Sequence, residues 1–105
     1  GLDKQPCEIS EKGKVQYLAS VKLHDEFTIF SKLSDHKLNF IQPDVIQMQY
    51  EDFEALSKIY YEWSDREEND CRFYVKVYDY STTKDSYKSS LSIVERYFYK
   101  YESRS

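Results

Sequence analysis

The sequence predicts an α+β domain in which a mostly antiparallel sheet carries two amphipathic helices packed on one face. Two patterns predict this class: apolar residues alternate at period two in some segments, and they recur in steps of three and four in others. In addition, only 2 glycines and 2 prolines interrupt the 105 residues, so the elements should be long. The predicted order is β-β-β-α-β-α, in a single domain covering residues 1–105.

The N-terminal part of the chain predicts a three-stranded antiparallel meander. Residues 1–13 are polar and indicate an extended lead-in, and residues 14–23, 27–33 and 38–41 indicate strands separated by polar turns. The predicted apolar face of the first strand consists of Val15, Tyr17, Ala19, Val21 and Leu23. In the second strand, one face holds Phe27, Ile29 and Leu33, and the other holds Thr28, Phe30 and Lys32.

A helix is predicted next, because Asp44 and Gln47 have the spacing of an N-terminal capping box. Its apolar stripe, expected to face the core, consists of Ile46, Tyr50, Phe53, Leu56, Tyr60 and Trp63. Residues 46–50 also alternate, so the first turn could instead be strand, with Asp52 capping a shorter helix. Tyr61 lies off the stripe and is expected to reach solvent.

The C-terminal part predicts a loop, a strand and a closing helix. Residues 64–70 are charged and lack the central glycine and alternating oxygen ligands of a calcium loop. Residues 71–80 form the clearest strand, with Phe73, Val75 and Val77 on one face and Arg72, Tyr74, Lys76 and Tyr78 on the other. Residues 91–101 indicate a closing helix whose stripe consists of Leu91, Val94, Phe98 and Tyr101.

The composition of the chain disfavours two classes of binding partner, nucleic acids and membranes. The formal net charge of −4 disfavours nucleic acid and anionic membranes, because phosphates and acidic lipids attract basic proteins. No apolar run approaches the ~20 residues that span a bilayer. The chain begins without Met, and we expect it to work within a larger protein or complex.

Cys7 and Cys71 stand alone, without the paired spacing of a zinc site. They could form one disulfide in a secreted protein or remain two reduced thiols in an intracellular one. A single pair is not the dense cysteine framework of small secreted domains. The sequence therefore favours reduced thiols and an intracellular location.

The best catalytic candidates are two histidines, each beside an aspartate: His24 with Asp25, and His36 with Asp35. They bracket the second predicted strand, which at about 3.3 Å per residue separates them by roughly 25 Å. No nucleophile elbow, phosphate-binding glycine loop or zinc-protease motif is present. The sequence predicts no enzyme, no catalytic residue, no metal and no cofactor.

An excess of tyrosine points to protein–protein interaction instead. The chain has 11 Tyr, 6 Phe and 1 Trp, and Tyr and Arg are enriched at protein interfaces. The predicted interface consists of Arg72, Tyr74, Lys76 and Tyr78 on the fourth strand, together with Tyr61, Tyr97 and Tyr99. The alternative is that a helix covers each sheet face and buries these rings. An exposed sheet edge could also accept a partner strand.

Two further functions stay open. Alternating rings and cations on residues 72–78 could stack single-stranded bases. The segment YEDFEAL, through Tyr50, Asp52, Phe53 and Leu56, resembles the start of the first helix in phosphoinositide-binding PX domains. That resemblance implies a preceding three-stranded meander and a membrane-associated role. The lipid site would be degenerate, because residues 48 and 49 are Met and Gln where the family has basic residues.

Overall fold

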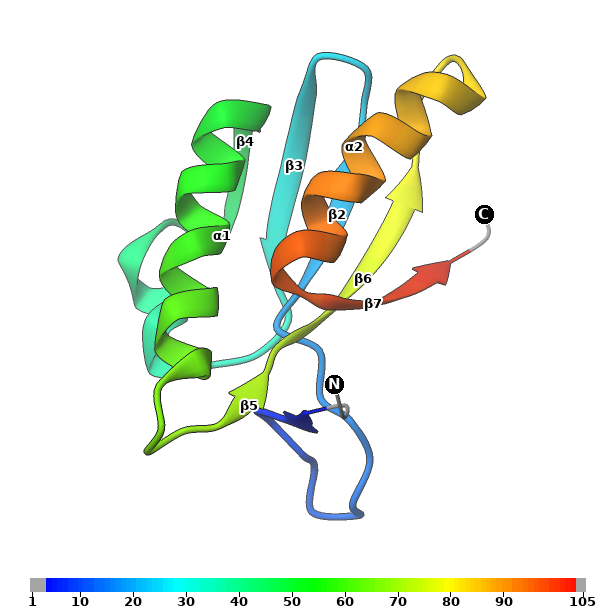
Figure 1. Cartoon of the computed structure of the whole chain (residues 1–105). Coiled ribbons are helices and arrows are strands. Elements are labelled where there is room, and N and C mark those ends of the chain that lie inside the picture. The colour runs from blue at the N-terminus through cyan, green and yellow to red at the C-terminus, as the bar shows by residue number, and fades with distance from the viewer. Residues whose placement is uncertain (1–3, 104–105) are drawn as a thin grey trace.

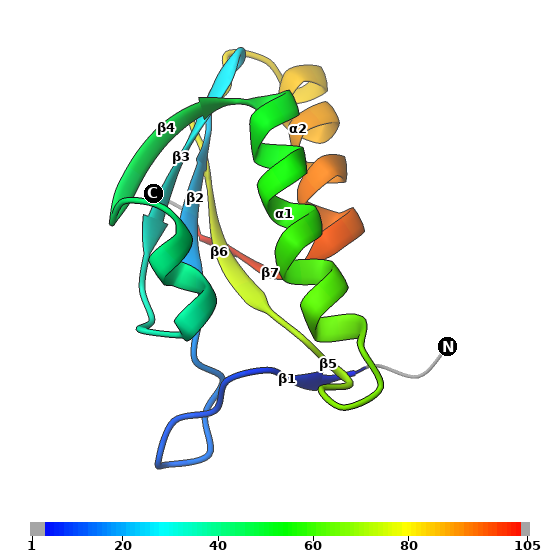
Figure 2. The same cartoon turned by 90° about the vertical axis from the view of Figure 1, so that its left-hand side faces the viewer.

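Two helices lie against one face of a five-stranded sheet in the computed structural model, which describes residues 4–103 (Figure 1). In chain order the elements are β1 (Gln5–Pro6), β2 (Ala19–Leu23), β3 (Phe27–Lys32), the 3₁₀ helix η1 (Lys37–Ile41), β4 (Val45–Gln49), α1 (Tyr50–Asp65), β5 (Cys71–Arg72), β6 (Tyr74–Asp79), α2 (Lys84–Tyr97) and β7 (Tyr99–Ser103). Figure 2 shows the sheet nearly edge-on, with α1 and α2 on the same side. The predicted α+β class is confirmed, including the placement of both helices on one face.

The sheet combines an antiparallel half with a parallel half. Its strand order is β4-β3-β2-β6-β7. β2, β3 and β4 form an antiparallel meander, whereas β6 pairs parallel with β2, and β7 pairs parallel with β6. Parallel neighbours need a crossover connection, and α2 supplies it between β6 and β7. Outside this sheet, β1 and β5 form a two-stranded parallel pair.

The core lies between the sheet and the helices. Its fully buried side chains include Leu18, Ala19, Val21, Leu23, Phe30, Phe53, Tyr60, Phe73, Val75, Val77, Val94 and Phe98. The predicted burial of Phe73, Val75 and Val77 is confirmed. The buried side of β3 holds Thr28 and Phe30. The Thr28 hydroxyl donates to the Lys22 carbonyl oxygen, so its burial leaves no hydroxyl without a partner.

The predicted face of the first strand is wrong at Tyr17. Leu18 and Ala19 are both 0% exposed, so two consecutive residues point inward and the alternation shifts by one at the start of β2. The Leu18 amide donates to the Tyr74 carbonyl oxygen, which holds this shift in place. Tyr17 therefore lies near Tyr74 on the opposite face, while Ala19 and the apolar residues after it keep their predicted side.

Residues 38–41 do not form the third strand that the sequence predicted there. Those residues lie in η1, and the third strand is β4, the alternative that the alternation of residues 46–50 left open. Asn39 is fully buried within η1, and its amide donates to the carbonyl oxygens of Leu18 and Ser34, while Tyr60 donates to its Oδ1. A helical turn places this polar side chain inward. The predicted capping box is wrong as well, because α1 begins at Tyr50.

The closing helix ends earlier than predicted. α2 ends at Tyr97, and residues 99–103 form β7 beside β6. The Arg72 guanidinium donates to the carbonyl oxygen of Glu95 at 2.8 Å and satisfies an acceptor of the last helical turn. Tyr101 is consequently not on a buried helix stripe but on the sheet, with 56% of its surface exposed.

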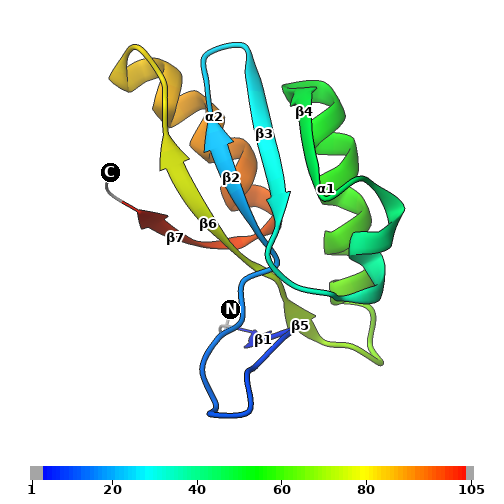
Figure 3. The same ribbon diagram turned by 180° about the vertical axis from the view of Figure 1, so that it is seen from behind.

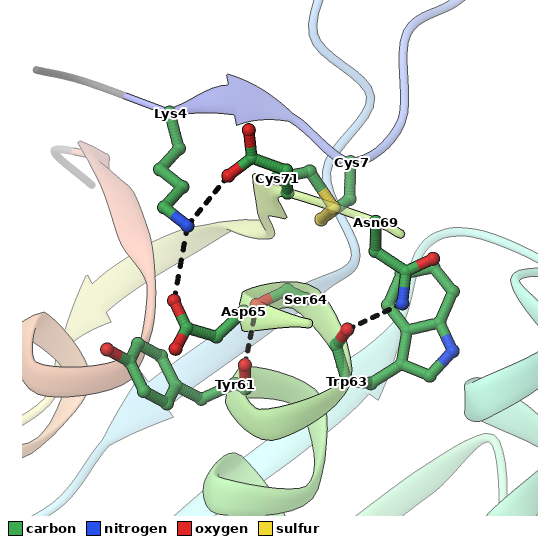
Figure 4. Close-up of a disulfide and its surroundings, with 9 residues drawn as sticks. Lys4, Cys7, Tyr61, Trp63, Ser64, Asp65, Asn69 and Cys71 are labelled. Carbon is green, nitrogen blue, oxygen red and sulfur yellow. Dashed lines mark hydrogen bonds and ion pairs between the residues drawn. A yellow bond between two sulfur atoms is a disulfide. The ribbon is translucent and has the colours of Figure 1, made fainter. Parts of the chain in front are cut away.

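The prediction of reduced cysteines is wrong, because Cys7 and Cys71 form a disulfide (Figure 4). The parallel pairing of β1 with β5 brings the two residues together across 64 positions of sequence. The Lys4 ammonium forms ion pairs with Asp65 at 3.2 Å and Asp70 at 2.9 Å beside this bond. The lead-in is therefore tied to the end of α1; its residues 1–3 lie outside the described residues.

Candidate functional site

The sheet face turned away from the helices is the candidate functional site, and we call it the open face (Figure 3). The strand register places fourteen side chains on it: Val45, Gln47 and Gln49 of β4; Phe27, Ile29 and Ser31 of β3; Ser20 and Lys22 of β2; Tyr74, Lys76 and Tyr78 of β6; and Tyr99, Tyr101 and Ser103 of β7. None of these strand residues is acidic, although the chain has 19 Asp and Glu. Both helices lie on the other face, so the alternative of a helix on each face is wrong.

Tyrosine rings form a connected group on this face. Tyr17 contacts Tyr74 with ring centroids 6.3 Å apart and Tyr101 with centroids 6.4 Å apart, and Tyr74 contacts Tyr99 at 5.1 Å. The planes of each pair are inclined by 60° to 82°. Edge-to-face contacts of this kind stabilise aromatic pairs beyond their buried area, so the rings hold one another in position.

Two cations lie over the rings. The Lys76 ammonium is 5.1 Å from the centroid of Tyr17, and the Arg72 guanidinium is 4.7 Å from that of Tyr99. Arg72 also lies 5.7 Å from the ring of Tyr61, which contacts Tyr97 at 5.9 Å. The array thus continues from the sheet around its edge to both helices. We call these residues the tyrosine array: Tyr17, Tyr61, Arg72, Tyr74, Lys76, Tyr97, Tyr99 and Tyr101.

Six of the seven predicted interface residues belong to this array. The seventh, Tyr78, lies on the same face opposite Lys22 of the neighbouring strand, but outside the array. Sequence reasoning missed Tyr17 and Tyr101, which were assigned to buried faces. The period-two pattern of residues 99–103 was the available signal for Tyr101, because it places Tyr99 and Tyr101 on one side of a strand.

Three residues of the array line a hollow of about 400 Å³ between the end of α2 and strands β6 and β7. Its wall consists of Arg72, Tyr74, Glu95, Phe98, Tyr99 and Lys100. Burial lowers the pKa of the Lys100 ammonium, but its ion pairs with Glu95 at 3.2 Å and Glu102 at 3.3 Å outweigh this effect and raise the pKa overall. The hydroxyl of Tyr99 accepts a hydrogen bond from the Lys4 amide at 2.9 Å. The array therefore has both ring surfaces and polar rims to offer a partner.

A smaller aromatic group lies at the β2–β3 turn. The His24 ring stacks on Phe27 with centroids 4.4 Å apart and on Tyr80 with centroids 5.1 Å apart. The Lys22 ammonium is 6.0 Å from the Tyr80 ring. The neighbouring Asp25 does not orient this histidine: its carboxylate accepts hydrogen bonds from Thr82 and Ser86, which lower its pKa. These bonds attach the turn to the start of α2.

The other histidine, His36, is built into the fold. Its Nδ1 accepts a hydrogen bond from the Leu38 amide at 3.2 Å at the start of η1. Its ring packs edge-on against Trp63 and Phe73, with centroids 4.9 Å and 5.0 Å away, and burial lowers its pKa. Within residues 4–103, no group of three His, Cys, Asp or Glu side chains could hold a metal ion.

Comparisons with protein-family models, with curated proteins and with solved structures find no match to this chain. The segment that resembles PX domains begins α1 directly after the β2–β3–β4 meander. In it, Phe53 is fully buried and the Tyr50 hydroxyl donates to the His24 carbonyl oxygen. These residues therefore have structural roles in this fold. Neither helix within residues 4–103 is long and apolar enough to cross a membrane.

Proposed function

We propose that this protein is a non-enzymatic protein-interaction module, and that the open face with its tyrosine array is the surface that binds the partner. One observation carries the proposal: a five-stranded sheet leaves one face uncovered, and its fourteen strand positions hold no acidic residue. The face contributes two lysines, while the other residues of the chain sum to −6 from the formal total of −4. Charge is thus segregated, and the partner surface should be neutral or acidic.

The geometry of the array favours a protein over single-stranded nucleic acid. Bases stack on flat, accessible ring faces. Here Lys76 and Arg72 lie over the faces of Tyr17 and Tyr99, and the tyrosine rings meet edge to face. Each tyrosine of the array joins a ring to a hydroxyl group, which suits the mixed apolar and hydrogen-bonded contacts of protein interfaces.

The disulfide bears on where the module works. Disulfides persist in oxidising compartments and are rare where thiols are kept reduced. We therefore propose that the protein works in an oxidising compartment, whereas the sequence, interpreted with reduced thiols, favoured an intracellular location. The array contains Arg72, the residue that follows Cys71, so the bond also fixes one end of the proposed binding surface.

Site-specific photocrosslinking tests the proposal. A photoreactive phenylalanine replaces Tyr101 on the open face or, as a matched control, Ile59 on α1, which is 48% exposed. We expect a discrete crosslinked protein from the first position and none from the second. The affinity of that partner should fall at least about tenfold in the double variant Tyr74→Ala/Tyr78→Ala, as for interface tyrosines of moderate importance.

Three results would count against the proposal. Equal crosslinking from both positions would mean that the open face is not selective, and no crosslink from Tyr101 would mean that it is not the interface. The third is tight, strongly salt-dependent binding of a fluorescent oligouridine that is lost in Lys76→Glu, which would assign the face to single-stranded RNA. Circular dichroism of each variant separates loss of binding from loss of fold.

A further inference from the structure

The β4 edge of the sheet is a second surface, separate from the tyrosine array. β4 is the outermost strand, with β3 as its only sheet neighbour among residues 4–103. The Lys32 amide donates to the Asp44 carbonyl oxygen, which fixes the alternation of hydrogen-bonded pairs along this antiparallel ladder. By that alternation, Val45 and Gln47 direct their N–H and C=O groups away from β3. The backbone of β4 can therefore pair with one more strand.

Nothing in the sequence of β4 protects this edge. Natural edge strands usually carry a charged residue, a proline or a bulge that blocks pairing with another chain. Val45–Gln49 has no charge and no proline, and all five residues pair with β3 without a bulge. Val45 of β4 is 61% exposed, and Phe40 and Ile41 of the preceding η1 are 74% and 51% exposed. Lys32, which pairs with Asp44 next to β4, lies 5.6 Å from the centroid of the Phe40 ring. Large apolar side chains thus lie in the open next to an unblocked strand.

A groove runs along the same edge. A hollow of about 450 Å³ is bounded by β4 and by the first turns of α1. Its wall consists of Phe27, Gln42, Ile46, Gln47, Met48, Gln49, Asp52 and Leu56. In strand addition, the backbone of an extended peptide supplies affinity and pockets for alternate side chains supply specificity. The apolar part of such a pocket consists of Phe27, Ile46, Met48 and Leu56.

We propose that the β4 edge binds an extended segment of a partner protein as an additional strand. The segment has apolar side chains at alternate positions, which enter the hollow beside Met48 and Leu56. It also has a lysine or arginine that lies near Asp52, the acidic residue of the groove. At the other end of the strand, Asp44 pairs with Lys32 at 3.5 Å but keeps 93% of its side chain exposed, so it can also contact a basic residue of the segment.

Charge also argues against a second copy of this chain as the occupant. Two β4 strands related by a twofold axis through Gln47 would pair antiparallel, so that residue 44 of one copy lies opposite residue 50 of the other. This would bring Asp44 of each copy toward the first turn of the other α1, which holds Glu51 and Asp52. Like charges juxtaposed in this way oppose association.

Selection from a displayed library of short random peptides, with the intact disulfide-bonded protein as bait, tests the proposal. We expect enriched sequences with alternating apolar residues and a lysine or arginine. Their affinity should fall about tenfold or more in Gln47→Pro, which removes an outward N–H but no hydrogen bond to β3. Gln47→Ala keeps that N–H and should bind within about twofold of the parent, because it removes no backbone contact.

Two further readouts keep the test decisive if Gln47→Pro unfolds. On peptide binding, hydrogen exchange of the Val45 and Gln47 amides should slow, and selection against Asp52→Lys should yield peptides without the basic residue. Failure to enrich any alternating peptide would overturn the proposal, as would enriched peptides that leave those amides unprotected. A dimer in sedimentation that Gln47→Pro abolishes would assign the edge to a second copy instead. None of these outcomes depends on the tyrosine array.

Discussion

The two sides of β6 differ in the kind of residue they carry and in how far those residues are exposed. Phe73, just before it, and Val75 within it are 2% and 0% exposed and pack under the helices. Tyr74 and Lys76, their neighbours in sequence, point to the open face and remain partly exposed. From Phe73 to Val77 the covered side is apolar, whereas each open-side residue joins an apolar body to a polar end. Burial on one side stabilises the fold, and amphipathic residues on the other tolerate both water and a partner.

Because the two sides differ in burial, removing an aromatic side chain should lower the free energy of unfolding more on the covered side than on the open side. Phe53→Ala removes a fully buried ring of α1 from the core between the helices and the covered side of the sheet. We expect a loss of about 3–5 kcal/mol in the free energy of unfolding. Urea denaturation followed by circular dichroism measures it. A loss below about 1 kcal/mol would mean that the helices do not pack on the sheet as described.

The disulfide attaches Cys71, which lies just before β6, to Cys7. Its removal tests whether the two sides of β6 depend on that attachment. We expect the double variant Cys7→Ser/Cys71→Ser to lose about 2–4 kcal/mol, because the bond closes a loop with a sequence separation of 64. Parent protein in reductant is the matched control and should unfold at the same urea concentration as the variant. Two titratable thiols in the oxidised, folded parent would contradict the bond.

The smallest effect is expected on the open side. Tyr101→Ala removes a ring that is 56% exposed, and we expect a change within about 1 kcal/mol in the free energy of unfolding. The same urea titration compares this variant directly with Phe53→Ala. If the two losses were alike, the open face would be part of the folding core and its rings would not be reserved for a partner.

Much of the arrangement of the proposed interface residues could be predicted, because these residues lie within regular, alternating segments. The pattern of residues 72–78 assigned both sides of β6 correctly, since a strand with one buried side needs no distant information to set its faces. The same reasoning assigned Tyr17 to the wrong face, because the alternation shifts at Leu18 and Ala19. That shift is held by a hydrogen bond from Leu18 to Tyr74, a partner that is distant in sequence.

By itself, the sequence determined the α+β class, the apolar stripe of α1 and the buried side of β6, since each follows from local periodicity. Only the tertiary structure decided that residues 99–103 form a strand, that Cys7 meets Cys71, and that Tyr101 joins the open face. The physical reason is that strand pairing and disulfide formation depend on neighbours supplied by distant parts of the chain. Because the tendency of a segment to form a strand depends on its neighbours, a short segment cannot show which part of the chain it will pair with.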